Sequence, residues 1–210
     1  MKVVLIRHGQ TDWNKKKKIQ GHTNTALDCD GHRESAAITK ALEQDGIDLI
    51  FSSPLKRAYS TIEPLAKRKQ KAIICSKNLM ERGFGIVEGL EIGNIMSAKA
   101  HTQNLILRKT AEKNYRPDGG ESLYDVHIRV KEFLDFLSTI DIKGVVVCVT
   151  HGGVLDILYR IIMDEPLSSE RKWAIPNGAF FLLERCEGDF KIIKWAETSH
   201  LNSSGMLDEY

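Results

Sequence analysis

The sequence predicts an α/β fold of three layers, with helices covering both faces of a mainly parallel sheet. Two apolar runs, 3–6 (VVLI) and 144–149 (GVVVCV), are rich in β-branched residues and have the length of buried strands. Between them, strand-like and helix-like segments alternate, an order that favours parallel pairing. Each run leads into a His-Gly pair, His8-Gly9 and His151-Gly152. Because the carboxyl ends of parallel strands meet at one edge, we expect both histidines at that edge.

The first half of the chain supplies two further strands and two helices. Residues 10–25 are polar and predict a loop, and 30–44 have apolar residues at helical spacing before Gly46. Strands are predicted at 48–51 and 71–75. After Ser52-Ser53-Pro54 we expect a helix capped by serine and opened by proline. Arg57 would lie in its first turn, where a cation opposes the helix dipole and calls for an anionic partner or solvent.

The second half predicts helices, a central strand and a C-terminal β-hairpin. Residues 79–89 form a glycine-rich loop in which Glu81 or Glu88 could be a site acid or a surface charge, and 97–114 favour a polar helix. Ser122-x-x-Asp125 is a capping box that opens an amphipathic helix. His127 and Arg129 lie off its apolar stripe and are expected at the surface. The remaining predicted segments are a buried helix at 154–163, hairpin strands at 180–184 and 190–195, and a loosely held tail from Glu197.

Length and composition favour a single cytoplasmic domain, residues 1–210. The chain is 42% hydrophobic with a net charge of +2, which gives no strong case for nucleic acid or an anionic membrane. The strand-like run directly after Met1 leads us to expect no signal peptide, and no apolar run approaches ~18 residues. Cys75 and Cys148 belong to strand-like runs and are expected to be buried thiols in a reducing compartment. The lysines at 15–18 could be a solvated loop or a patch that attracts anions, but no aromatic residues interleave for base stacking.

The predicted strand ends collect cationic and imidazole side chains. Arg7, His8, Arg57 and His151 would share one edge of the sheet. Guanidinium groups would repel a zinc ion but match the oxygens of a phosphate, so we expect no metal and an anionic substrate. In phosphoryl transfer, a neutral imidazole attacks phosphorus, cationic groups hold the phosphoryl oxygens, and a carboxylic acid protonates the leaving group.

Five motifs, in order along most of the chain, resemble those of the histidine phosphatase superfamily, the phosphoglycerate mutase-like proteins. The segment from Arg7 to Asn14 resembles the signature R-H-G-E/Q-T-x-x-N. The other matches are SSPLxRAxxT from Ser52, LxExxxGxxEG from Leu79, GES from Gly120 and VTHG from Val149. The combination is far more specific than any one motif alone.

The resemblance implies roles for individual residues. His8 would be the phosphorylated nucleophile, with Arg7, Arg57 and His151 completing the phosphate pocket and Glu81, rather than Glu88, as the proton donor. Asn14 would help to bind the phosphoryl group. The remaining residues expected to bind substrate are Gln20, Gly21, Thr23 and Gly152. No metal or organic cofactor is implied, and the expected partner is a small phosphorylated metabolite bound by a monomer or homodimer.

Within this superfamily the sequence favours a phosphatase. Residues 90–119 form a short variable insertion that could cover the site. Dedicated mutases carry a longer insertion here, and the paired arginines and the tyrosine typical of them are not found in this sequence. Phe84 stands where such a tyrosine is expected, and the closing Thr198-Ser-His200-Leu201 resembles the tail of small-substrate phosphatases. The alternatives are a 2,3-bisphosphoglycerate-dependent phosphoglycerate mutase and a non-catalytic phosphoanion-binding protein.

Overall fold

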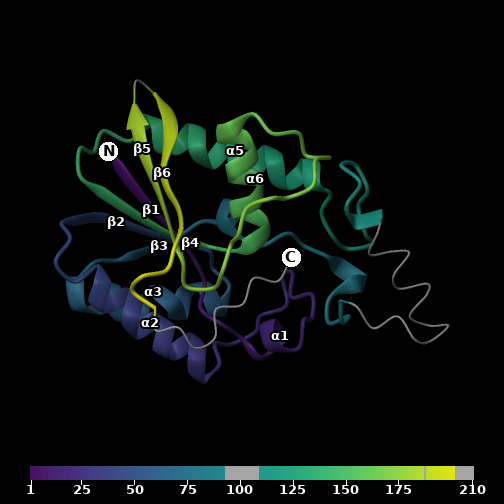
Figure 1. Cartoon of the computed structure of the whole chain (residues 1–210), viewed down its shortest axis with the longest axis horizontal. Coiled ribbons are helices and arrows are strands. Elements are labelled where there is room, and N and C mark those ends of the chain that lie inside the picture. Colours follow the sequence, from purple (N-terminus) through teal and green to yellow (C-terminus); the bar gives the residue numbers. More distant parts are fainter. Residues whose placement is uncertain (93–108, 187, 202–210) are drawn as a thin grey trace.

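A six-stranded sheet organises the protein in the computed structural model, which describes residues 1–92, 109–186 and 188–201 (Figure 1). The strands lie in the order β3-β2-β4-β1-β5-β6. β1 to β4 are parallel to one another, whereas β5 is antiparallel to β1 and β6 to β5. The strands are β1 (Lys2–Arg7), β2 (Ile47–Ser52), β3 (Ile73–Cys75), β4 (Val145–Thr150), β5 (Phe180–Cys186) and β6 (Asp189–Glu197).

Helices cover the sheet on both sides, which confirms the predicted three-layer α/β/α fold and its C-terminal β-hairpin. Helices α2 (Cys29–Ala41) and α3 (Lys56–Lys69) lie below the sheet in Figure 1, and α5 (Leu123–Thr139) and α6 (Gly152–Met163) lie above it. The short elements are α1 (Asp12–Lys15) and two 3₁₀ turns, η1 (Lys77–Leu79) and η2 (Gly85–Val87).

The two central strands contribute to two separate cores. Alternate side chains of a strand point to opposite faces, so β1 and β4 carry apolar residues on both faces, up to the polar residues at their carboxyl ends. Val3 and Leu5 pack with residues of α5 and α6, whereas Val4 and Ile6 pack with residues of α2 and α3. This double burial explains why both strands are continuous apolar runs in the sequence.

The start of α3 differs from the prediction. The helix begins at Lys56 after Leu55, and neither Ser52 nor Ser53 caps it, so the predicted serine cap is wrong. Instead the Asn24 side chain, from a loop distant in sequence, accepts a hydrogen bond from the Lys56 backbone N–H at 2.7 Å. By contrast, the predicted capping box between Ser122 and Asp125 is present at the start of α5.

Two further predictions are corrected at the periphery of the sheet. Cys75 is exposed because β3 is a three-residue edge strand, whereas Cys148 in the central strand β4 is buried as expected. The tail from Glu197, predicted to be loosely held, packs against the protein as far as Leu201, its last described residue. The His200 ring stacks on Phe180 with centroids 3.8 Å apart, and Leu201 is buried.

Most of the predicted helix at 97–114 lies outside the described residues, which resume with a helical Lys109 and Thr110 followed by turns. The predicted insertion at 90–119 is likewise described only at its two ends. In the part of the chain that the structure describes, no helix has the length and apolar character needed to span a bilayer.

Candidate active site

The ends of β1 and β4 bring the two expected histidines together. The strands are neighbours, with Arg7 paired to Thr150, and the His8 backbone N–H donates to the Thr150 carbonyl at 3.0 Å. The rings of His8 and His151 have centroids 5.0 Å apart, and both residues are at most 2% exposed. The parallel pairing thus places two imidazoles from opposite halves of the chain side by side.

The hydrogen bonding of His8 defines which of its two ring nitrogens carries the hydrogen. Its Nδ1 lies 2.7 Å from the Gly9 carbonyl oxygen. Because a carbonyl can only accept, Nδ1 carries the hydrogen and Nε2 keeps its lone pair. Burial lowers the pKa of His8 well below its usual value, and the positive charges of Arg57 and Arg7 lower it further. His8 is therefore a neutral imidazole.

Arg57 enters the site from the first turn of α3 and is fully buried. Its guanidinium donates to the carbonyls of Thr23 at 2.9 Å and Gly21 at 2.8 Å. Arg7, at the end of β1, is also buried and donates to the Ile175 carbonyl. These bonds to backbone carbonyls fix both guanidinium groups beside His8.

A small cavity lies between these groups. It is lined by Arg7, His8, Lys18, Ile19, Gln20, Gly21, Arg57, Glu81, Phe84 and Ile92. Three cationic side chains therefore face one carboxyl group. This excess of positive charge around a neutral imidazole suits an anion that carries two negative charges, such as a phosphoryl group.

Glu81 approaches the cavity from the loop after η1 and is 7% exposed. Its Oε1 accepts a hydrogen bond from the Arg82 N–H at 2.8 Å, and its Oε2 accepts one from the Gly153 N–H at 3.2 Å. A Cβ atom at Gly153 would lie only 2.4 Å from Oε1. The absence of a side chain at position 153 thus lets the carboxyl group pack against the start of α6.

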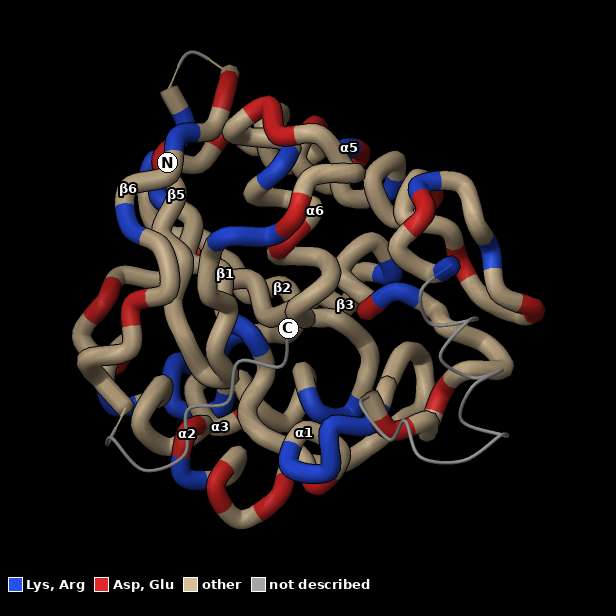
Figure 2. The backbone as a smooth tube through the Cα atoms, turned by 45° about the vertical axis from the view of Figure 1, so that its right-hand side comes forward, with Lys and Arg blue, Asp and Glu red and all other residues tan. Residues whose placement is uncertain are grey.

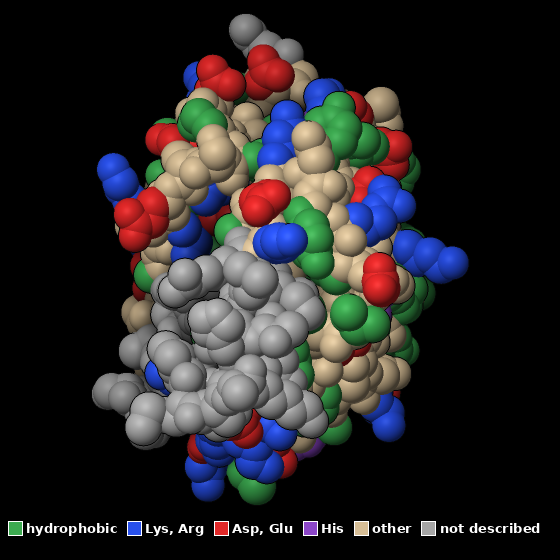
Figure 3. Space-filling view, turned by 90° about the vertical axis from the view of Figure 1, so that its right-hand side faces the viewer, with side chains coloured by type: hydrophobic (Ala, Val, Ile, Leu, Met, Phe, Trp, Pro, Cys, Tyr) green, Lys and Arg blue, Asp and Glu red, His purple; other side chains and the backbone are tan. Residues whose placement is uncertain are grey.

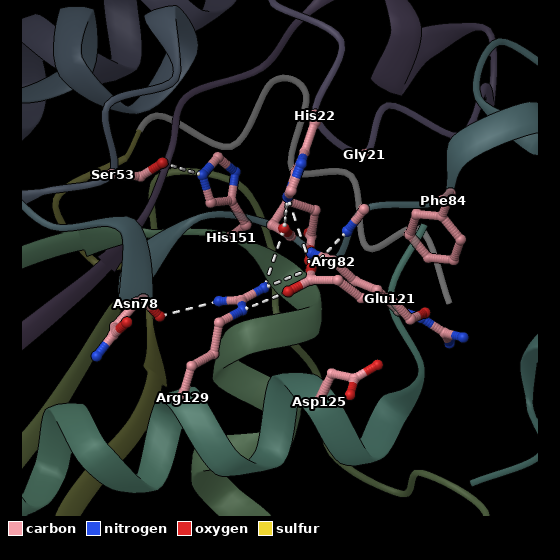
Figure 4. Close-up of polar contacts among 12 residues, drawn as sticks. Gly21, His22, Ser53, Asn78, Arg82, Phe84, Glu121, Asp125, Arg129 and His151 are labelled. Atoms are coloured by element: carbon pink, nitrogen blue, oxygen red, sulfur yellow. Dashed lines mark hydrogen bonds and ion pairs between the residues drawn. The ribbon is translucent and has the colours of Figure 1, made fainter. Parts of the chain in front are cut away.

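Arg129, expected at the surface, instead holds the loop that carries Glu81 (Figure 4). Its side chain is only 13% exposed and pairs with Glu121 at 2.9 Å. It also donates to the carbonyls of Asn78 at 2.9 Å and Glu81 at 3.1 Å. The surface prediction for Arg129 is therefore wrong, because the two carbonyls that it binds come from a loop about fifty residues earlier, which no helical spacing reveals.

Two more polar residues lie at the site (Figure 4): His22, which no sequence pattern singles out, and Ser53, which the sequence marks only as a helix cap and as part of the SSPL motif. The Nε2 of His22 lies 2.8 Å from the Glu81 carbonyl oxygen. The Nε2 of His151 lies 2.8 Å from the Ser53 hydroxyl oxygen, so Ser53 orients this imidazole rather than capping a helix. Burial lowers the pKa of His151 well below its usual value, with Arg57 and His8 adding to the effect.

The other residues expected to bind substrate divide into two groups. Gln20 and Gly21 line the cavity, whereas Asn14, Thr23 and Gly152 are not part of its described lining. The Asn14 Oδ1 accepts a hydrogen bond from the Thr11 N–H at 2.9 Å and so closes the first turn of α1. The Thr23 hydroxyl donates to Glu88 at 2.6 Å. Both side chains are thus used to shape the loop around the cavity.

Glu88, which is expected to stabilise the fold rather than to donate a proton, binds backbone groups of two loops. Its carboxylate accepts hydrogen bonds from the backbone N–H groups of His22, Thr23 and Phe84, at 2.9 to 3.1 Å. It therefore ties the loop after α1 to the loop that carries Glu81, and Glu81 is the glutamate that reaches the cavity.

The lysines at 15–18 form a continuous basic stretch beside α1 (Figure 2). Lys15 pairs with Asp28 at 3.1 Å and with Asp30 at 2.8 Å. Lys18 lines the cavity and lies 3.6 Å from Glu91. The stretch is thus more than a solvated loop, because one lysine is tied to α2 and another contributes charge to the site.

Comparison with known proteins agrees with this geometry. The profile of the histidine phosphatase superfamily (branch 1) matches residues 3–198. Phosphoserine phosphatase 1 of Hydrogenobacter thermophilus is 27% identical over 96% of this chain and 94% of its own length. Phosphoglycerate mutase-like protein 4 of Arabidopsis thaliana is 29% identical over 98% of this chain and 89% of its own length.

Among solved structures, the mycobacterial glucosyl-3-phosphoglycerate phosphatase superposes with a TM-score of 0.80 at 26% identity, covering 94% of this chain and 99% of its own. The profile match spans nearly the whole chain and includes the strand ends that carry both histidines. The chain therefore belongs to branch 1 of the histidine phosphatase superfamily.

Proposed function

We propose that this protein hydrolyses phosphomonoesters through a phosphohistidine intermediate on His8. The observation that carries the proposal is the state of His8: a buried, neutral imidazole whose Nε2 lone pair is free, beside two buried guanidinium groups and one carboxyl group. An imidazole must be neutral to attack phosphorus, and the surrounding cations reduce the repulsion between it and an anionic phosphoryl group.

In the first step, the Nε2 of His8 forms a bond to phosphorus as the bond between phosphorus and the ester oxygen breaks. Arg7, Arg57 and His151 hold the phosphoryl oxygens, where negative charge is spread in the transition state. The start of α6 adds the positive end of its helix dipole directly after His151. Glu81 donates its proton to the departing oxygen, which leaves as an alcohol.

In the second step, a water molecule attacks the phosphohistidine. The Glu81 carboxylate accepts a proton from this water, the nitrogen–phosphorus bond breaks, and inorganic phosphate leaves. His8 returns to its neutral form and Glu81 to its protonated form, so the cycle is balanced.

Hydrolysis is favoured over a phosphoglycerate mutase reaction by the position of Arg82. Its guanidinium donates to the carbonyls of Thr110 at 2.6 Å, Tyr115 at 3.2 Å and Glu121 at 2.8 Å. Because Nε and both terminal nitrogens of this guanidinium donate to backbone carbonyls, Arg82 holds a loop and has fewer donors left for the carboxylate of a phosphoglycerate. Relatives named as phosphatases support the same choice.

The test is a screen for phosphate release from a panel of phosphomonoesters, with conversion of 3- to 2-phosphoglycerate followed in parallel. We expect release without isomerisation, and an acid-labile, base-stable phosphoenzyme in rapid-quench samples. His8→Ala should lower the rate by roughly 10³-fold or more. His32→Ala, at an exposed position on α2, is the control.

Isomerisation that requires a bisphosphoglycerate, with little phosphate released, would identify a mutase instead. Binding of inorganic phosphate without turnover of any ester would identify a phosphoanion-binding protein.

A further inference from the structure

A second and larger cavity, of about 350 Å³, adjoins the phosphate site. Ile19, Phe84 and Ile92 line both cavities, so the two spaces share a wall. The volume falls in the range of ~300–1,000 Å³ that is typical of small-molecule pockets. A ligand held at His8 could therefore extend directly into the larger cavity.

The lining of the larger cavity is mostly apolar. Its hydrophobic residues come from several elements and loops: Ile19, Phe84, Ile92, Ala111, Leu123, Val126 and Ile157. Val126 and Ile157 belong to α5 and α6 and are part of the buried core cluster that these helices share with the sheet. Apolar surface of this kind stabilises apolar ligands by removing them from water.

The charged residues on the lining are mostly engaged with the protein itself. Arg82 donates to three backbone carbonyls, as described above, and Asp156 pairs with Arg160 at 2.9 Å. Arg171 also lies on the lining and could attract an anionic ligand. Small anionic esters must therefore be included in any test of what the cavity selects.

The position of Glu81 connects the larger cavity to the chemistry. Gly153, whose N–H donates to the Glu81 Oε2, is itself part of the lining of the larger cavity. The proposed proton donor thus stands at the junction of the two spaces. In the proposed reaction the ester oxygen receives its proton from Glu81, so the group attached to that oxygen would extend toward the larger cavity.

We propose that the larger cavity binds the alcohol part of the substrate and makes the enzyme selective for monoesters of apolar alcohols, alkyl or aryl. This inference rests on the proposed phosphatase function and adds a substrate class to it. The apolar lining favours such a group. A small charged group such as that of phosphoserine would not make apolar contacts with this lining.

The test is a series of n-alkyl phosphates, from ethyl to octyl. The leaving-group chemistry is the same along the series, so only the buried apolar surface changes. Burial of one methylene is worth about 0.8 kcal/mol, which corresponds to roughly a fourfold rise in kcat/KM. We expect kcat/KM to rise with chain length until the cavity is filled, and hexyl phosphate to exceed phosphoserine and 3-phosphoglycerate by at least tenfold.

A pair of variants on one helix tests where the alkyl chain binds. Leu123→Trp at the start of α5 fills part of the cavity and should move the plateau of the series to a shorter chain. Ile128→Trp, at a position exposed on the same helix, is the control and should leave the series unchanged. Thermal unfolding of both variants would check that they are folded.

The possible failures can be told apart. If ethyl phosphate is hydrolysed but kcat/KM is flat along the series, or if the anionic esters are preferred, the inference is overturned and the phosphatase proposal stands. If no ester releases phosphate, the proposed function fails and the inference with it. The wild-type series alone decides between these outcomes, even if Leu123→Trp does not fold.

Discussion

Burial at the strand ends has opposite consequences for the imidazoles and the guanidiniums. It lowers the pKa of His8 and His151 and keeps both rings neutral near pH 7. A guanidinium stays protonated in proteins, so Arg7 and Arg57 keep their charge. The proposed nucleophile can therefore be neutral while the guanidinium groups proposed to bind the phosphoryl group keep their positive charge in the same pocket.

The proposed role of Glu81 predicts a leaving-group effect. Glu81→Gln should slow the reaction of alkyl phosphates by roughly 10²–10⁴-fold, because an alkoxide is a poor leaving group without a proton. p-Nitrophenyl phosphate should lose much less, since nitrophenolate needs little protonation. Pre-steady-state rates with both substrates measure the difference, and Glu132→Gln at an exposed position of α5 is the control. An equal loss with both substrates would contradict a proton-donor role.

Arg129 should act as a positioning residue for Glu81. Arg129→Ala removes the bonds to the Asn78 and Glu81 carbonyls, so kcat for alkyl phosphates should fall by about tenfold while KM changes little. The loss should again be smaller with p-nitrophenyl phosphate, a dependence that general loss of stability would not produce. Arg116→Ala removes an exposed pair with Asp125 near the start of the same helix and serves as the control. Loss of kcat to the same extent with both substrates would leave Arg129 a purely structural role.

At the scale of elements, α2 is tied to the loop that follows His8 through a buried carboxyl group. Glu34 is 9% exposed, and its Oε2 accepts a hydrogen bond from the Gln10 N–H at 2.7 Å. Burial raises the pKa of Glu34 from 4.5 to about 7. The folded protein therefore holds a proton that the unfolded chain releases between these pH values, and stability should fall as the pH rises through this window.

Glu34→Gln tests this linkage. Glutamine keeps an oxygen acceptor for the Gln10 N–H but carries no charge, so the variant should be more stable than the wild type at pH 8, by about 1–3 kcal/mol. The difference should shrink toward pH 5, where Glu34 is protonated in the folded protein. Urea unfolding at pH 5, 6.5 and 8 measures it, with the exposed Glu132→Gln as the control. A difference that does not depend on pH would show that Glu34 titrates normally.

On the scale of the whole molecule, surface charges of both signs nearly balance to a net charge of +2, whereas cations outnumber carboxyl groups on the lining of the small cavity. Acidic and basic residues are distributed over the whole chain, with basic stretches at 15–18 and at 67–71 (Figure 2). On the face shown in Figure 3, charged and hydrophobic side chains are interspersed among the described residues. The cations that matter for a phosphate ligand are therefore those that the fold buries or half-buries around His8.

This arrangement predicts activity without a divalent cation. Arg7, Arg57 and Lys18 line the cavity and can neutralise the phosphoryl charge that Mg²⁺ neutralises in many phosphotransferases. Phosphate release after dialysis against EDTA should stay within about twofold of the untreated rate, and added Mg²⁺ should not raise it. A loss of activity that is restored by a metal would contradict the proposed mechanism.

Much of the fold and of the site could be predicted from the sequence, because the information is local. The buried strands appear as apolar runs, the start of α5 as Ser122 and Asp125 three residues apart, and the site as residues that directly follow strands. Five motifs in order then indicate the family. Each of these signals depends on neighbours in the sequence or on the rule that parallel strands end at one edge.

Other features were decided only by the tertiary structure. Asn24 caps α3 across 32 residues, Arg129 holds the Glu81 loop across 48, and β3 lies at the edge of the sheet and exposes Cys75. The apolar cavity likewise forms only where separate loops meet α5 and α6. A sequence by itself determines which residues can form strands, helices and caps with their neighbours. Contacts between distant segments depend on how the finished layers pack, and that packing decides which side chains are buried and which groups they meet.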